Sequence, residues 1–493
     1  MGKYLLGIDI GTSAVKAAVF DFSGSLIADS LESYPTFYPQ PRFAEQDPDE
    51  WWAAVCRAVK SIAQRVNPRD ISAVGIDGQG WAAVAADSEG NPLCRTPIWT
   101  DTRSVAQCDE MRSVMSDGEW FEICKNPIQP GYSLPKVLWY KENAPDVFSK
   151  AAYILQSNSF IGMRLTGNAS QDVSQGYAYH FFDMKNRRWD ESALKALGLP
   201  AELFPEPVQC SKVIGSVTAQ ASRETGLCEG IPVIAGGLDA ACAALGVGAV
   251  SPGTTQEQSG QAGGMSICAA GCGSTPDLIM GCHTVPGIWL LQGGTTGGSG
   301  ALRWLRGNIS PELTYAQMDE LADEVPAGSE GLIFLPYLAG ERSPLWNPFA
   351  KGVFYGLTFA HTRAHMIRSV MEGVAFSLRH NLETAEKAGA KVNLMRSAGG
   401  SSVSRVWTQM KADVTGKTIE VPKGNSATVL GAAILAGTGA GIFESEAKAA
   451  DSAVKADRVH TPDETKSEVY SAAYEKYIEI YERLSPLMKE ERI

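Results

Sequence analysis

The chain has 493 residues, of which 44% are hydrophobic and 20% charged, so it can bury a large core and lacks the composition of a disordered protein. Its net charge of −12 argues against a nucleic-acid-binding protein, which needs a basic surface. The sequence contains no run of 18 apolar residues, and an acid interrupts the N-terminal apolar stretch. We therefore expect no membrane span, no signal peptide and a cytoplasmic location.

The most informative stretch is a glycine-containing loop, residues 7–13, between two short apolar runs of strand-like composition. The hydroxyls of Thr12 and Ser13 suit phosphate oxygens, and the carboxylate of Asp9 suits Mg²⁺. The loop lacks the Gly-Lys-Ser/Thr ending and the following helix of a Walker A loop. A strand–phosphate loop–strand hairpin is typical of the start of an actin-like ATPase domain. Taken alone, the same loop is equally typical of an ordinary tight hairpin.

Strands and helices alternate through the rest of the first half. Asp47 and Pro48 have the features of an N-cap and a first helical position, and an apolar stripe of period 3.6 follows them. The predicted strands are residues 25–33, 71–77 and 231–237, and the predicted helices follow Asp47 and cover residues 136–140 and 191–197.

The same pattern begins again after residue 253. The second half is predicted to contain a hairpin (254–261 and 263–268), strands near 288–291, 332–336 and 394–398, and helices from 299, over 365–387 and over 428–436. We therefore predict an α/β fold of two actin-like (ribonuclease H-like) ATPase domains, residues 1–247 and 248–493, with the active site in a cleft between them. The two glycine-rich hairpins would then hold a nucleotide from both sides.

Asp239 is the candidate catalytic residue. It follows a predicted strand and begins an alanine-rich helix. An acid at this position is often only a helix cap, since it favours the positive end of the helix. Alternatively, an Asp that reaches a substrate hydroxyl can remove its proton as the oxygen attacks phosphorus, a contribution of about 10²–10⁴ in rate.

Several motifs together resemble the FGGY family of carbohydrate kinases over nearly the whole chain. The resemblance rests on residues 7–13, 45–48 (Glu-Gln-Asp-Pro), 99–103 (Trp-Thr-Asp-Thr-Arg), 164–167 (Arg-Leu-Thr-Gly), 236–240 (Gly-Gly-Leu-Asp-Ala), 335–344 (Leu-Pro-Tyr-Leu-Ala-Gly-Glu-Arg-Ser-Pro) and 372–375 (Glu-Gly-Val-Ala). Each motif is weak alone, but their number, order and spacing are specific. Within the family the chain is most similar to the xylulokinase branch, which phosphorylates D-xylulose at O5 with MgATP.

The resemblance implies a role for individual positions. Asp239 would be the catalytic base and Asp9 the carboxylate that orients Mg²⁺. The ATP-binding positions would be Gly11, Thr12 and Ser13 in the first phosphate loop, Lys16 behind it, Gly260 and Gln261 in the second loop, and Gly399, Gly400 and Ser401 in the adenosine pocket. The sugar-binding positions would be Gln79, Gly80, Trp81, Trp99, Asp101 and Arg103, with Asp239. The structural alternatives are a core aromatic role for Trp99 and a helix-start salt bridge for Arg103.

Two departures from the family pattern bear on the substrate. Residues 79–82 read Gln-Gly-Trp-Ala where xylulokinases usually have Gln-Met-His-Gly, and a Trp replaces the hydrogen-bonding His with a flat apolar surface. Residues 260–262 read Gly-Gln-Ala where Gly-Thr-Ser or Gly-Thr-Thr is usual. Gln261 can still donate to a phosphate oxygen, but its bulk would alter the geometry or slow the transfer.

The predicted activity is ATP-dependent phosphorylation of a ketopentose, D-xylulose to D-xylulose 5-phosphate. The alternatives are an FGGY kinase for another sugar or polyol (ribulose, L-xylulose or another ketose), a weakly catalytic sugar or nucleotide sensor, and a chaperone-type ATPase. The expected partners are the sugar and ATP, and we expect binding to neither nucleic acid nor membrane. A second copy of the chain, in a homodimer, is the one further partner considered.

Overall fold

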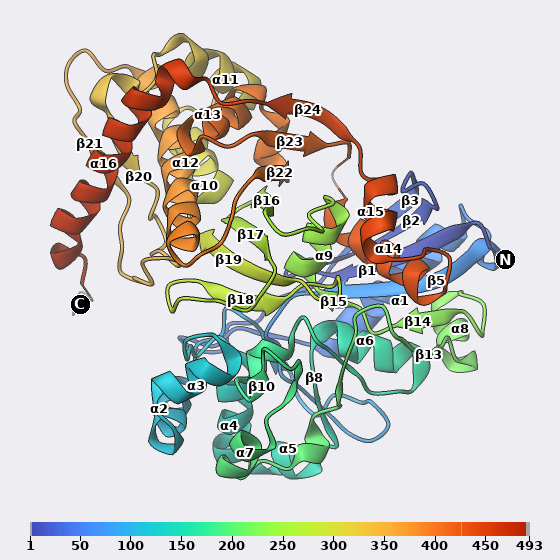
Figure 1. Ribbon diagram of the computed structural model, residues 1–493. Helices are drawn as coiled ribbons and strands as arrows, with labels where there is room; N and C mark the ends of the chain where they lie inside the picture. The colour runs from blue at the N-terminus through green and yellow to red at the C-terminus, as the bar shows by residue number, and fades with distance from the viewer. Residues whose placement is uncertain (1, 425, 490–493) are drawn as a thin grey trace.

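The computed structural model describes residues 2–424 and 426–489. Two seven-stranded mixed sheets organise it, and the chain completes the first before it begins the second (Figure 1). Among the described helices, none combines the length and the apolar character that a membrane crossing requires.

The first sheet is built around the predicted N-terminal hairpin. β1 pairs antiparallel with β2, β2 with β3, and the other side of β1 pairs parallel with β5. Beyond β5 the sheet continues through β14 to β13, and the short β15 also pairs with β5. The strands are β1 (Tyr4–Ile10), β2 (Ala14–Asp21), β3 (Leu26–Ser33), β5 (Ile71–Gly78), β13 (Val213–Ser216), β14 (Pro232–Ile234) and β15 (Gly237–Leu238).

The second sheet repeats this plan. The hairpin of β16 and β17 is antiparallel, β17 pairs with β19 on one side, and β16 pairs parallel with β22 on the other, followed by β23 and β24. Among the described strands, β18 at the outer edge of this sheet has no counterpart in the first sheet and was not predicted as a separate strand. The strands are β16 (Thr254–Ser259), β17 (Gly263–Ala269), β18 (Ile279–Cys282), β19 (Trp289–Thr295), β22 (Leu394–Ala398), β23 (Ile419–Pro422) and β24 (Ala456–His460). The repeat confirms the predicted two-domain α/β fold.

Helices cover both sheets, and their ends follow local sequence signals. Asp47 caps the first long helix through the N–H of Asp49, and Pro48 occupies its first position. The helices are α1 (Pro48–Ala63), α6 (Ser157–Thr166), α8 (Ala219–Thr225), α9 (Asp239–Gly246), α10 (Gly298–Ile309), α11 (Tyr315–Glu324), α12 (Arg363–Lys387), α13 (Arg405–Thr415), α14 (Ala427–Gly439), α15 (Glu446–Ala453) and α16 (Ser467–Leu484). The predicted helices and strands are found with end shifts of a few residues.

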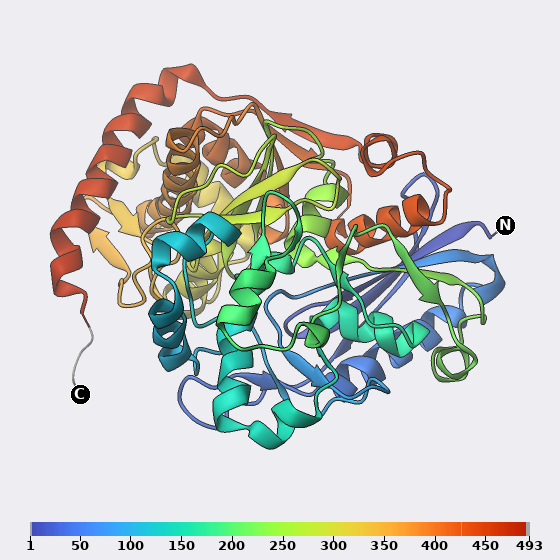
Figure 2. The same cartoon turned by 60° about the horizontal axis from the view of Figure 1, so that its bottom comes forward.

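The segment between β5 and β13 forms an additional layer of short elements on the first domain, coloured blue to green in Figure 2. Its helices are α2 (Val105–Val114), α3 (Asp117–Cys124), α4 (Ser133–Asn143), α5 (Pro145–Lys150) and α7 (Glu191–Ala196). Its strands, with one that precedes β5, are β4 (Glu45–Gln46), β6 (Val84–Ala86), β7 (Thr96–Pro97), β8 (Tyr153–Leu155), β9 (Gln171–Asp172), β10 (Phe182–Asp183), β11 (Arg188–Trp189) and β12 (Pro207–Val208). A further two-stranded sheet, β20 (Ile333–Leu335) and β21 (Val353–Tyr355), belongs to the second half.

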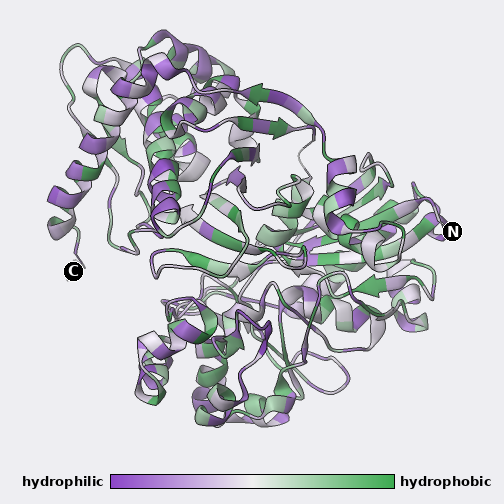
Figure 3. Cartoon of the chain, in the orientation of Figure 1, coloured by the Kyte–Doolittle hydropathy of each residue, from purple (hydrophilic) through white to green (hydrophobic). Residues whose placement is uncertain are grey.

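Short 3-10 turns complete the secondary structure, at Pro68–Asp70, Gly176–Tyr179, Ala201–Leu203, Ser329–Gly331, Gly400–Val403, Glu464–Lys466 and Ser485–Leu487. Hydrophobic residues concentrate in the sheets and the helices against them, whereas the peripheral α16 is largely hydrophilic (Figure 3).

α14 joins the two halves of the chain. Although it belongs to the second half, it packs on β1 and β5 of the first sheet and on α9. The approach requires glycine, because a Cβ on Gly75 would lie 1.9 Å from the carbonyl oxygen of Ala432, and one on Gly246 would lie 1.8 Å from that of Ala427. The two domains therefore share one closely packed layer of helices.

Candidate active site

Three carboxylates meet where β1, β5 and β15 end. The sequence Gly-Ile-Asp occurs in β1 (residues 7–9) and in β5 (residues 75–77), and the two copies pair in register, so Asp9 lies beside Asp77. β15 joins the opposite edge of β5, and Asp239 follows it as the first residue of α9. Because these three strands run parallel, their carboxyl ends lie at one edge of the sheet, with Asp77 between Asp9 and Asp239.

These carboxylates are crowded, and in the described part of the chain only Asp239 accepts a backbone hydrogen bond, from the N–H of Ala240 at 2.6 Å. Asp77 is fully buried, and neither of its oxygens, nor Oδ1 of Asp9, has a hydrogen-bond partner among the described residues. Burial raises the pKa of Asp9 to about 6, and burial with the charge of Asp9 raises the pKa of Asp239 to about 7. Burial and the same neighbour also raise the pKa of Asp77. Buried carboxylate oxygens without donors fit a hard divalent cation such as Mg²⁺.

The pKa of Asp239 predicts how stability depends on pH. The folded protein holds the proton of Asp239 up to a pH of about 7, whereas the unfolded chain loses it near the ordinary pKa of 3.8. The contribution of Asp239 to stability is therefore present below about pH 3.8 and is lost as the pH rises through about 7. In Mg²⁺-free buffer we expect Asp239→Asn to unfold at higher urea concentration than wild type at about pH 8, and the difference to shrink towards about pH 4.5. A difference that does not change with pH would contradict this assignment.

The first predicted phosphate loop is a tight turn supported by the first domain. The N–H of Gly11 donates to the carbonyl of Ala14 at 3.1 Å and closes the turn. The indole N–H of Trp99 donates to the hydroxyl oxygen of Thr12 at 3.0 Å, which leaves the hydroxyl proton of Thr12 available to a ligand. Ser13 is exposed at the tip. Trp99, which is predicted to line the sugar pocket, therefore also supports the first phosphate loop directly.

Lys16 connects this loop region to the second half of the chain. It lies opposite Asp9 in the pairing of β1 with β2, and its charge lowers the pKa of Asp9 against the larger effect of burial. Its ammonium group donates to the hydroxyl of Ser426 at 2.8 Å, at the N-cap of α14. Lys16 thus places a positive charge next to the carboxylates and ties α14 to the site.

The second predicted phosphate loop lies at the N-terminus of α10. The N–H of Ser299 donates to the carbonyl of Gly260 at 2.9 Å, and the N–H of Gly300 donates to that of Gln261 at 3.0 Å. The side chain of Gln261 lies against Gly300. A Cβ added to Gly300 would be 2.4 Å from Nε2 of Gln261. Gly300 therefore accommodates the bulk of Gln261. A helix N-terminus beside such a loop favours an anion.

The predicted adenosine turn, residues 399–401, lies next to this loop. Gly399 has a φ of 91°, and a Cβ there would lie 3.2 Å from the carbonyl oxygen of Ser259, which precedes the second loop. The hydroxyl of Ser401 accepts a hydrogen bond from Lys411 at 2.8 Å, and Lys411 also forms a buried ion pair with Glu257 at 2.7 Å. The structure therefore brings Gly260, Gln261 and the turn 399–401 together.

Residues 79–81 form one wall of the predicted sugar site. The amide of Gln79 donates to Gln46 at 2.7 Å, and its oxygen has no partner among the described residues. The indole N–H of Trp81 donates to the hydroxyl of Tyr177 at 2.9 Å, and the ring meets Tyr132 edge to face at 4.5 Å. Gly80, between them, leaves room for Leu238, which a Cβ would approach to 2.8 Å. An unpaired amide oxygen beside aromatic rings fits a polar organic ligand.

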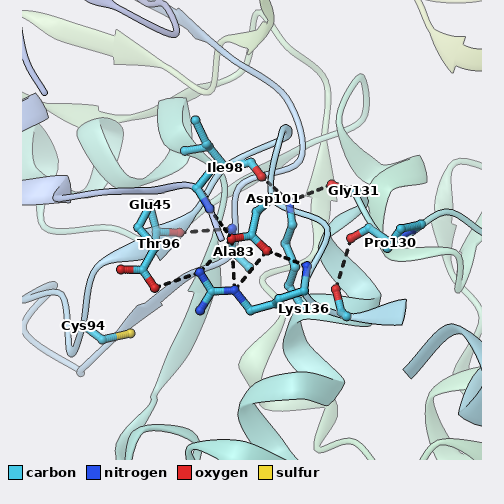
Figure 4. A network of polar contacts seen from close by, with 12 residues as sticks. Glu45, Ala83, Cys94, Thr96, Ile98, Asp101, Pro130, Gly131 and Lys136 are labelled. Atoms are coloured by element: carbon cyan, nitrogen blue, oxygen red, sulfur yellow. Dashed lines mark hydrogen bonds and ion pairs between the residues drawn. The ribbon is translucent and has the colours of Figure 1, made fainter. Parts of the chain in front are cut away.

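Asp101 and Arg103 form a closed network (Figure 4). The guanidinium of Arg103 pairs with Asp101 and with Glu45, each at 2.7 Å, and lies 3.7 Å from the ring centre of Phe43. Asp101 is fully buried and also accepts the N–H of Ala44 at 2.7 Å. These partners agree with the salt-bridge alternative for Arg103, and direct contact of either residue with a sugar stays a prediction.

Lys136, also drawn in Figure 4, was not predicted to matter. Its ammonium group is fully buried and donates to the carbonyls of Trp81 and Ile98 at 2.8 Å and of Gly131 at 2.6 Å. It thereby fixes the backbone of the sugar wall. Its place in an amphipathic helix does not reveal this role, because the three carbonyls come from distant or irregular segments.

Asp77 was also missed as a site residue, although the sequence contained a signal for it. It is the last residue of the predicted strand 71–77, and the Gly-Ile-Asp sequence that it ends repeats that of residues 7–9. Two copies of one tripeptide at the ends of two buried strands indicate that the two acids share a sheet edge.

Comparisons with known proteins agree with this geometry. Residues 4–246 match the N-terminal domain of the FGGY family of carbohydrate kinases, and residues 256–440 match its C-terminal domain. The chain is 31% identical over 491 residues to a xylulose kinase of Escherichia coli, a match that covers 98% of this chain and 99% of the relative. It is 29% identical over 482 residues to a gluconokinase of Bacillus subtilis, covering 95% of this chain and 94% of the relative. The crystal structure of a xylulose kinase from Rhodospirillum rubrum superposes with a TM-score of 0.90 at 29% identity, covering 98% of this chain and 99% of the other. The chain is therefore a sugar kinase that belongs to the FGGY family of carbohydrate kinases.

Proposed function

We propose that this kinase transfers the γ-phosphate of ATP to a hydroxyl of a ketopentose, converting D-xylulose to D-xylulose 5-phosphate. Residues 1–247 would bind the sugar and residues 248–493 the adenosine. The observation that carries the proposal is the position of Asp239, which begins α9 beside the Asp9–Asp77 pair. Its charge also contributes to the raised pKa of Tyr177, the hydroxyl that holds Trp81, so the carboxylate lies near the sugar wall.

Asp239 would act as the general base. Its pKa of about 7 leaves a large fraction ionised at neutral pH and makes the carboxylate basic enough to accept a proton from an attacking hydroxyl. The sugar oxygen would form a bond to the γ-phosphorus as the bond from that phosphorus to the bridging oxygen breaks. The electron pair of the broken bond would leave with ADP, and the hydroxyl proton would pass to Asp239. The two loops would position the phosphates through backbone N–H groups and the Thr12 hydroxyl.

Asp9 and Asp77 would hold the Mg²⁺ that accompanies ATP. Mg²⁺ usually takes one or two protein carboxylates together with substrate phosphates, and these two residues offer unpartnered oxygens side by side. When bound, the ion would neutralise charge on the phosphates. Lys16 would keep Asp9 ionised, since its charge lowers the pKa of that carboxyl.

This assignment predicts the effect of carboxylate variants on metal binding. In the presence of ADP, Asp9→Asn and Asp77→Asn should each weaken Mn²⁺ binding by about tenfold or more, measured by the electron paramagnetic resonance signal of free Mn²⁺. The exposed Asp146→Asn on α5 is the matched control and should bind Mn²⁺ like wild type. Normal binding by Asp77→Asn together with weak binding by Asp9→Asn would leave Asp9 as the sole protein ligand.

A neutral sugar is favoured over a sugar acid by the charges around the sugar wall. Arg103 is paired with two carboxylates, and Lys136 is occupied by three carbonyls. The groups left unpartnered there include the amide oxygens of Gln79 and Gln175 and the hydroxyl of Tyr132. Amide oxygens accept hydrogen bonds from sugar hydroxyls, whereas a carboxylate would need a free cation, which neither Arg103 nor Lys136 provides.

A coupled ADP-release assay with MgATP across ketopentoses, ketohexoses, polyols and aldonates tests the proposal. D-Xylulose should give the highest kcat/KM, and gluconate should give little turnover. Preference for ribulose, L-xylulose or another polyol would retain the kinase and replace the substrate. Sugar binding in calorimetry without turnover of any compound would favour the sensor alternative.

A further inference from the structure

Arg342 is a largely enclosed arginine whose guanidinium has no partner. Among the described residues it makes no side-chain hydrogen bond and no ion pair, and burial lowers its pKa. The other enclosed arginines differ. Arg103 pairs with two carboxylates, and Arg368 pairs with Glu372 at 2.8 Å and donates to two further oxygens. The charge of Glu341 offsets part of the effect of burial on the pKa of Arg342, but it forms no ion pair with the guanidinium. An enclosed cation without an ion pair is unfavourable unless a ligand supplies an anion.

The guanidinium of Arg342 lies between the two predicted phosphate loops. Its central carbon is 5.9 Å from the ring centre of Trp99, and the indole N–H of Trp99 donates to Thr12 of the first loop. On the other side, a terminal nitrogen of the guanidinium lies close to Gly294, because a Cβ added to that glycine would be 2.7 Å from it. Gly294 pairs with Gly264, two residues after the second loop. Arg342 thus extends from the second domain to Trp99, which supports the first phosphate loop.

Hydrogen bonds of its two neighbours hold the backbone at Arg342 in place. Glu341 accepts hydrogen bonds from the hydroxyl of Thr295 at 2.6 Å, the N–H of Thr296 at 2.9 Å and the N–H of Arg342 at 2.7 Å. The hydroxyl of Ser343 accepts the N–H of Gly294 at 2.6 Å. Both neighbours of Arg342 are therefore tied to the end of β19 and the turn after it, and the carboxylate of Glu341 is occupied by other donors.

We propose that Arg342 binds the γ-phosphate oxygens of ATP and stabilises the negative charge that develops on them during transfer, which makes it a catalytic residue. The inference rests on the proposed function. A planar guanidinium offers several N–H donors to phosphate oxygens and retains its charge. Arg342 itself transfers no proton and forms no covalent bond. The phosphoryl group still passes from the bridging oxygen of ATP to the sugar oxygen, and Asp239 still accepts the hydroxyl proton.

The test compares two nucleotides that differ in the γ-phosphate. We would measure binding of Mg²⁺-ADP and of Mg²⁺ with a non-hydrolysable ATP analogue by calorimetry for wild type, Arg342→Gln and Arg342→Lys. Arg342→Gln should bind the analogue about 10–100-fold more weakly while its affinity for ADP changes less than about twofold. Its kcat should fall by about 10³-fold, as for other arginines that stabilise a transferring phosphoryl group. Arg342→Lys should recover part of both losses.

The exposed Arg223→Gln on α8 is the matched control, and all variants should share the thermal midpoint of wild type within a few degrees. Equal loss of ADP and analogue binding by Arg342→Gln, or no loss of either, would overturn the role of Arg342. If Arg342→Gln fails to fold, Arg342→Lys decides the question. A loss of analogue binding with unchanged ADP binding would support the role of Arg342, whereas equal loss of both nucleotides, or no loss of either, would overturn it. Failure of wild type itself to bind either nucleotide would instead refute the proposed kinase function.

Discussion

Replacing Asp239 by Asn is expected to abolish phosphoryl transfer without unfolding the protein. The amide cannot accept the hydroxyl proton, so kcat should fall by about 10²–10⁴-fold, the usual contribution of a general base. Nucleotide and sugar binding should remain, because the phosphate loops and residues 79–81 do not depend on this carboxylate for their hydrogen bonds. Fold stability at neutral pH should rise slightly, since the charge of Asp239 is buried beside that of Asp9.

The measurement is steady-state turnover with saturating sugar and MgATP, together with urea unfolding of the same samples. Asp146→Asn, an exposed acid on α5, controls for the loss of one negative charge and should turn over like wild type. If Asp239→Asn retains more than about a tenth of the wild-type turnover, Asp239 is not the base.

Replacing Gly246 by Ala should cause a large loss of stability for the addition of a single methyl group. The new Cβ would lie 1.8 Å from the carbonyl oxygen of Ala427, and backbone atoms of α14 cannot move aside independently. α9 and α14 would have to separate, which we expect to cost about 3 kcal/mol or more in the free energy of unfolding. Because Asp239 begins α9, residual folded protein should also show reduced kcat.

Urea unfolding at neutral pH measures this effect, and Gly118→Ala in α3 (Asp117–Cys124) provides the control. Nothing lies within 4 Å of a Cβ at Gly118, so the same chemical change should be neutral or stabilise by up to about 1 kcal/mol. Similar unfolding midpoints for Gly246→Ala and wild type would mean that the two helices are not in the close contact described.

Local sequence patterns predicted many of the helices and strands and the chemistry of single positions. Hydrophobic periodicity and caps are local, so the N-cap Asp47, the strand Leu394–Ala398 and the two glycine-rich hairpins could be predicted from neighbouring residues alone. The repetition of the hairpin also indicated two similar domains, and the motif set indicated the family. Asp9 and Asp239 were recognised because each acid ends or follows an apolar strand next to glycine.

Which of these groups meet, and which already have hydrogen-bond or ion-pair partners, depends on contacts between distant segments of the chain. α14 lies 180 residues or more from the strands and the helix on which it packs, and no local pattern specifies that its backbone will rest on Gly75 and Gly246. The pairing of Asp77 with Asp9 depends on the register of two strands separated in the chain. The same reason applies to the two arginines. Arg103 has Asp101 two residues away in the sequence, but only the fold brings Glu45 to it and leaves Arg342 without an ion pair among the described residues.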